Sequence, residues 1–178
     1  MNKKEKPPDK RPVRKHHRLN GFCYAEIGAY FITNCVKEGT YPFGRVVDNK
    51  MDLTKAGQIA ADQFKELPEF YKSISIDSFV VMPNHVHAIV KINDFIPGRS
   101  IPNIMQAYKS MCTRKIRAIG LKFDWQRSYY DSIIRDGAGI ERITEYIQNN
   151  PANWHKDAEN RETKLDIKKY YDKLVKGK

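Results

Sequence analysis

The 178-residue sequence lacks the features that membrane insertion, secretion and cysteine-based zinc sites require. No apolar run approaches the roughly 20 residues of a membrane-spanning helix. The basic N-terminus is not followed by an apolar segment, so it is not typical of a secretory signal. Three cysteines, Cys23, Cys35 and Cys112, cannot all pair and show no CxxC spacing. They favour a reducing cytoplasm and argue against a cysteine-bound zinc ion.

Acidic residues are in deficit, but only at the two ends of the chain. The formal net charge is +11; residues 1–18 carry +6, residues 164–178 carry +4, and the 145 residues between them carry +1. Basic ends suit a polyanion, for which nucleic acid is the commonest cytoplasmic candidate, although they also suit solubilising tails. We expect a disordered basic arm over 1–18, one domain over 19–155, and a basic, helical tail over 156–178.

Hydrophobic periodicity predicts an α+β domain. Strand-like runs cover 28–36, 73–82, 85–92 and 132–135, with a shorter one at 45–47, and helical spacing covers 54–67, 101–119 and 140–150. The order strand, helix, strand, strand, helix, strand is that of the split βαβ, or ferredoxin-like, fold. We therefore predict an antiparallel sheet with its helices packed on one face.

The strongest chemical signal is the segment MPNHVH at 82–87. On a strand, His85 and His87 project to the same face and could share one divalent metal ion. They could equally be two half-buried histidines with backbone partners. The segment YIQNNP at 146–151 places Tyr146 and Asn150 one helical turn apart, as a candidate phenol and amide for the same site, or as a packing residue and a helix end.

Together these segments resemble the HUH single-strand endonucleases, and most of all the REP-associated tyrosine transposases and their insertion-sequence relatives. The resemblance extends to RLNGF and GAYFITNC near the start, to FGRV at 43–46, and to DWQRSYYDSIIRD at 124–136, and it covers roughly residues 18–151. The combination is far more specific than a histidine pair alone. The segment after Pro151 is less similar to the family.

The resemblance implies a site and a reaction. His85 and His87 fall on the family's metal-binding pair, Asn150 on its polar third ligand, and Tyr146 on its nucleophile. The family implies Mg²⁺ or Mn²⁺, single-stranded or hairpin DNA in a prokaryotic cytoplasm, and a 5′-phosphotyrosine intermediate. Two imidazoles and an amide make a neutral ligand set, and we find no clustered Asp or Glu in the sequence. The base that activates the phenol is not identified.

Other residues are candidates for DNA contacts or for the nucleophile. Basic side chains that could meet phosphates are Lys109, Arg114, Arg117, Arg127, Arg135 and Arg142. Tyr108 lies on an apolar helical stripe, Tyr129 and Tyr130 could stack on bases, and Tyr170 and Tyr171 lie in the tail. A non-catalytic nucleic-acid-binding module and a metal hydrolase are the rival functions. A monomer and a homodimer, in which a partner would deliver Tyr146, both stay open.

Overall fold

The computed structural model describes residues 25–37, 40–163 and 165–177, and the predicted arm over 1–18 lies outside them. Its centre is an antiparallel sheet of β1 (Gly28–Cys35), β4 (Ile74–Val81), β5 (His85–Ile92) and β6 (Tyr130–Ile134), in the order β4-β5-β1-β6. This is the strand order of the predicted split βαβ fold. In the register, Thr33 pairs with His87 and Cys35 pairs with His85, on the two central strands.

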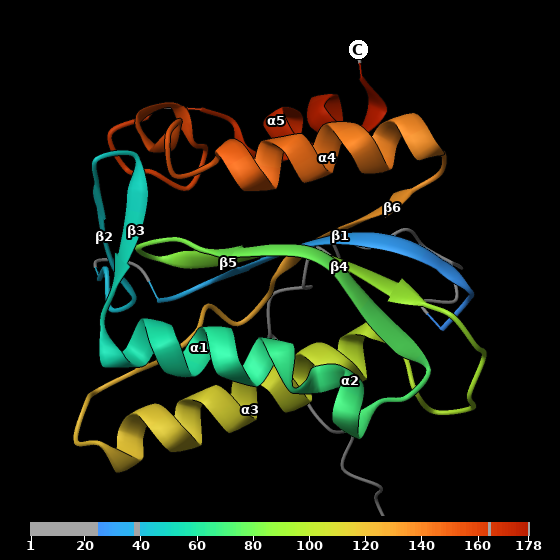
Figure 1. Ribbon diagram of the computed structural model, residues 1–178, viewed down its shortest axis with the longest axis horizontal. Helices are drawn as coiled ribbons and strands as arrows, with labels where there is room; N and C mark the ends of the chain where they lie inside the picture. Colours follow the sequence, from blue (N-terminus) through green and yellow to red (C-terminus); the bar gives the residue numbers. More distant parts are fainter. Residues whose placement is uncertain (1–24, 38–39, 164, 178) are drawn as a thin grey trace, which may run out of the picture.

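Helices cover both faces of the sheet (Figure 1). On one face lie α1 (Lys55–Lys65), α2 (Leu67–Phe70) and α3 (Ile101–Ala118); on the other lie α4 (Gly137–Asn149) and α5 (Ile167–Lys176). The fold class is confirmed, but the expectation that the helices pack on one face is wrong. The alternation of β5 explains the second layer: Val86, Ala88 and Val90 belong to the cluster under α1 and α3, whereas Ile89 belongs to the cluster under α4. Apolar side chains therefore lie on both faces of β5, and each face needs a covering layer.

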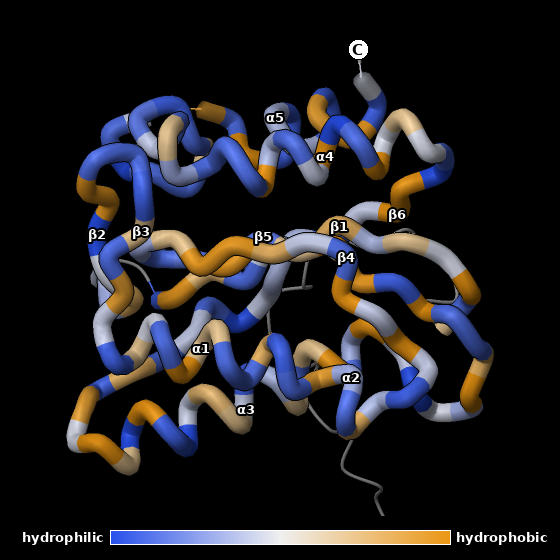
Figure 2. Tube along the Cα trace, in the orientation of Figure 1, coloured by the Kyte–Doolittle hydropathy of each residue, from blue (hydrophilic) through white to orange (hydrophobic). Residues whose placement is uncertain are grey.

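Hydropathy follows this arrangement, with β5 hydrophobic along much of its length between the two helical layers (Figure 2). The segment predicted as a tail takes part in the packing. Ala158 and Tyr171 are buried in the same cluster as Phe31 and Ile143. Residues 157–163 and 165–176 therefore contribute to the structural unit that carries the sheet.

A small hairpin projects beyond the main sheet. It consists of β2 (Gly44–Val47) and β3 (Lys50–Leu53), joined by Asp48 and Asn49. Both joining residues have positive φ, as a tight two-residue hairpin turn requires and as Asp and Asn tolerate. Within the described residues, no helix is long and apolar enough to cross a membrane.

Candidate active site

His85 and His87 lie on β5 and face α4, as the strand period predicts. Both are fully buried, and their ring centroids are 4.2 Å apart. Each ring is held through Nδ1: the Asn84 side-chain oxygen is 2.8 Å from Nδ1 of His85, and the Thr33 hydroxyl is 2.9 Å from Nδ1 of His87. Nδ1 partners of this kind leave Nε2 as the coordinating atom, an arrangement typical of metal-binding histidines.

Asp157 completes the group. Its Oδ1 lies 3.9 Å from Nε2 of His85, and its Oδ2 lies 3.6 Å from Nε2 of His87. The three side chains are buried, and the candidate ligand atoms lie within 4.8 Å of one another. Two imidazole nitrogens and a carboxylate are a donor set that binds divalent transition metals.

Sequence reasoning missed Asp157, which places a carboxylate beside a ligand set that was expected to be neutral. Asp157 follows α4 and a 3₁₀ turn (Trp154–Lys156) in an irregular segment that returns to the sheet. Neither a helical nor a strand period marks such a position. The available signal was the pair Asp157 and Glu159 in an otherwise basic end of the chain.

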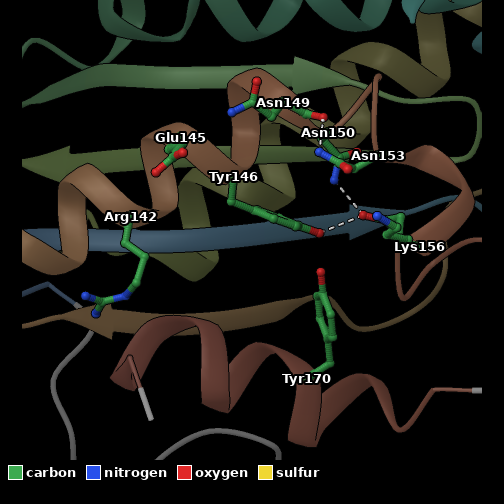
Figure 3. Close-up of a pocket in the computed structure, with 9 residues that line it drawn as sticks. Arg142, Glu145, Tyr146, Asn149, Asn150, Asn153, Lys156 and Tyr170 are labelled. Carbon is green, nitrogen blue, oxygen red and sulfur yellow. Dashed lines mark hydrogen bonds between the residues drawn. The ribbon is translucent and has the colours of Figure 1, made fainter.

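Tyr146 and Asn150 reach the same group from α4. The Tyr146 hydroxyl donates to Oδ2 of Asp157 at 2.6 Å and lies 3.1 Å from Nε2 of His87. The Asn150 amide nitrogen also donates to Oδ2 of Asp157, at 2.6 Å. The structure thus brings together the four residues that the sequence singled out, within a single chain. In Figure 3 a dashed line marks a hydrogen bond from each of the labelled side chains Tyr146 and Asn150, both of which are donors to Asp157.

Burial and charge set the protonation of the site. Burial lowers the pKa of His85 to about 3, with the neighbouring His87 acting in the same direction, so the ring is neutral at pH 7. Burial also raises the pKa of the Tyr146 phenol well above its ordinary value, and the negative charge of Asp157 raises it further. For Asp157, burial alone raises the pKa, but the two imidazoles and the Tyr146 hydrogen bond outweigh burial and lower it well below the usual range.

The hydrogen bonding of two buried polar atoms indicates whether a metal ion fits the site. Nε2 of His85 and Oδ1 of Asn150 have no hydrogen-bond partner among the described residues. Unsatisfied buried polar atoms are uncommon and costly unless a ligand or water engages them. One belongs to the candidate ligand group and the other to a side chain that contacts Asp157. The residues present therefore fit a divalent cation.

A cavity of about 340 Å³ opens over Tyr146. Residues from α4, from the segment after it and from α5 line this cavity, and Tyr170 on α5 points toward the Tyr146 hydroxyl (Figure 3). Lys156 contributes a cation and Glu145 an acid to its lining. The proposed site is therefore open to a ligand on the side of Tyr146.

The other candidate tyrosines occupy different environments. Tyr108 is fully buried in the core and donates to the Ala60 carbonyl at 3.1 Å. Tyr130 donates to Asp172, and Tyr171 donates to Glu159. Apart from Tyr146, only Tyr170 among the described tyrosines lines the cavity over the site.

The basic candidates separate into three groups. Arg142 donates to the carbonyls of Leu174 and Val175 at 3.0 and 2.9 Å, which ties the end of α5 to α4. Arg135 is exposed directly after β6. The remaining four line a groove along α3: Lys109, Arg114, Arg117 and Arg127.

Comparisons with known proteins agree with this arrangement. Residues 54–150, more than half of the chain, match the family model described as "Transposase IS200 like". An uncharacterized protein of Haemophilus influenzae is 34% identical over 164 residues, covering 81% of this chain and 91% of that protein. The chain belongs to the IS200-like transposase family, which confirms the resemblance found in the sequence and supports a transposase function.

A solved structure gives the same fold. A REP-associated tyrosine transposase bound to a REP hairpin superposes with a TM-score of 0.58 at 17% identity, covering 92% of this chain and 88% of that one. At this identity the match shows that the two proteins share a fold.

Proposed function

We propose that this transposase is a metal-dependent single-strand DNA endonuclease and strand transferase in which Tyr146 is the nucleophile. The observation that carries the proposal is the Tyr146 hydroxyl, 3.1 Å from Nε2 of His87 and 2.6 Å from Asp157, at the edge of a buried group able to bind a metal. Hairpin DNA is the proposed substrate, because the structural neighbour binds a hairpin.

His85, His87 and Asp157 are the residues that would hold the ion, with Asn150 as a further oxygen donor. Imidazole ligands suit Mn²⁺ better than Mg²⁺, which prefers oxygen, so Mn²⁺ is the better match of the two. A bound divalent ion supplies Lewis-acid polarisation of the scissile phosphate and a positive charge that favours the phenolate.

The chain's own residues define the rest of the reaction. Tyr146 forms an Oη–phosphorus bond while the phosphorus–O3′ bond breaks, which leaves a 5′-phosphotyrosine and a 3′ oxyanion that takes a proton from solvent to become a free 3′-hydroxyl. Asp157 accepts the phenolic hydrogen bond and so fixes the orientation of the hydroxyl. Because the pKa of Asp157 lies well below the usual range, the phenolic proton passes to solvent when the phenolate forms. A 3′-hydroxyl from a second strand can then attack the phosphotyrosine and restore the phosphodiester, which makes the enzyme a transferase.

The test is covalent capture on hairpin DNA with a labelled single-stranded flank. With Mn²⁺, the wild type should give a labelled adduct on a denaturing gel, and Tyr146→Phe should lower it at least about a thousandfold. The matched control is Tyr71→Phe, on the opposite face of the sheet, which should react as the wild type does. An undiminished adduct in Tyr146→Phe contradicts the nucleophile assignment.

The same gel separates the rival functions. A metal hydrolase is a second candidate because Asp157 supplies a carboxylate ligand that the sequence patterns did not reveal. Cleaved DNA without an adduct would favour that hydrolase. DNA binding with neither product would favour a non-catalytic module.

A further inference from the structure

A groove of about 770 Å³ runs along α3 and the segment 125–129, which leads from α3 toward β6. Figure 1 shows that α3 lies on the face of the sheet opposite α4 and α5. Its charged lining residues are all cations: Lys109, Arg114, Arg117 and Arg127. A surface with this charge attracts a polyanion.

Two of the four cations are partly occupied by neighbouring groups. Arg117 pairs with Asp124 at 2.6 Å. Lys109 donates to the Gln126 carbonyl at 2.6 Å, and burial lowers its pKa to about 8. Arg114 and Arg127 are both exposed. These two guanidinium groups are therefore the best placed to contact an added ligand.

The groove also contains aromatic surface. Trp125 and Tyr129 are half-buried in its lining, and the amine of Lys109 lies 6.0 Å from the centre of the Trp125 ring. Cations that follow a backbone, together with aromatic rings that can stack on bases, are the usual components of single-strand binding surfaces.

The groove leads toward the candidate active site around the end of β1. Gln126 lines both the groove and a second depression of about 410 Å³, which Asn84 and residues 158–161 also line. Asn84 contacts His85 through its side-chain oxygen and donates to the Glu159 carbonyl at 2.8 Å. The second depression therefore borders the segment that carries Asp157.

We propose that the groove binds the unpaired DNA strand that flanks the scissile phosphate. This inference rests on the proposed function, and it assigns a second DNA-binding surface on the far side of the sheet. The path from groove to site turns around the end of β1 within one small domain. Duplex DNA, with a persistence length of about 50 nm, does not bend so sharply at low cost, whereas a single strand does.

The test compares binding of an unstructured, fluorescently labelled oligonucleotide by the wild type and by the double variant Arg114→Ala/Arg127→Ala. Affinity should fall about tenfold, and the slope of log Kd against log salt should shrink by about 1.4, because two phosphate contacts are lost. The control is Lys55→Ala/Lys65→Ala, which removes two exposed cations from α1 and should leave both quantities unchanged. Equal losses in both variants, or no loss in either, would overturn the proposal.

A second ligand identifies what the groove holds. A blunt hairpin without unpaired flanks should bind the wild type and the groove variant equally well. A tenfold loss on the blunt hairpin would instead assign the groove to the paired stem. At saturating flanked DNA, the groove variant should still form the Tyr146 adduct, so loss of the adduct in the wild type refutes the proposed function without affecting the binding result.

Discussion

The two faces of the central sheet are both buried, yet they differ in what they bury. Beneath α1 and α3 most of the buried side chains are apolar, and the buried polar ones include Asn34, which donates to the sulfur of Met105 on α3, and Gln63 on α1. Beneath α4 and α5 the same two central strands bury Thr33, His85 and His87 against Asp157 and Asn150. Polar groups cost free energy to bury unless they are fully paired, and two atoms of this set are unpaired in the described residues.

The difference indicates that the two faces of the sheet have different roles. The α1–α3 face supplies stability through apolar burial, and the α4–α5 face holds reactive groups in fixed positions at some cost to stability. The period of two along β1 and β5 makes the division feasible, because neighbouring residues on one strand serve opposite faces. Variants on each face test whether the two roles are separable.

The largest effect on stability is expected from the apolar face. Ile116→Ala on α3 removes a fully buried side chain and should lower the free energy of unfolding by about 2–5 kcal/mol, measured by denaturant titration. Well below its melting temperature, the variant should form the covalent adduct at the wild-type rate. A slower reaction in the folded variant would mean that the two faces are not independent.

On the polar face, Asp157→Asn should remove the response to metal. In wild type, free Mn²⁺ at 100 times its Kd should stabilise the fold by about 2.7 kcal/mol, read as a rise in Tm. The variant should show almost none of this rise at the same concentration. Asp62→Asn, on α1, is the control and should keep the full shift; a full shift in Asp157→Asn would remove Asp157 from the ligand set.

A smaller effect is expected at Thr33, which contacts the candidate metal ligand His87. Thr33→Val removes the hydroxyl that lies 2.9 Å from Nδ1 of His87 while preserving the branched shape, and it should weaken Mn²⁺ binding about 10- to 100-fold. Thr33→Ser retains the hydroxyl and should bind as the wild type does. Weakening in Thr33→Ser but not in Thr33→Val would contradict a role of the hydroxyl and would point to packing of the γ-methyl group, which Val keeps and Ser lacks.

The regular spacing of residues in strands and helices made much of the candidate site predictable. A period of two placed His85 and His87 on one face, and helical spacing placed Tyr146 beside Asn150 on α4. The roles of these residues came from the family resemblance, since spacing alone did not separate Tyr146 from the other tyrosines. Membership of the family is confirmed, and the residue roles stay predictions.

Sequence reasoning missed Asp157 and the second helical layer, because hydrophobic periodicity gives no information about either. Asp157 stands in an irregular segment, and its approach to His85 and His87 depends on a chain reversal after Pro151. An amphipathic pattern shows that a helix has an apolar side, but not which face of a sheet that side covers. The second helical layer was therefore not predictable from α4 and α5 alone.

The most direct test of the account is to locate the covalent bond. The wild type is reacted with hairpin DNA carrying a single-stranded flank in the presence of Mn²⁺, digested with protease and nuclease, and analysed by tandem mass spectrometry. The account predicts a nucleotide attached through a 5′-phosphate to Tyr146. A nucleotide on Tyr170, which lines the same cavity, or on any other side chain would contradict it.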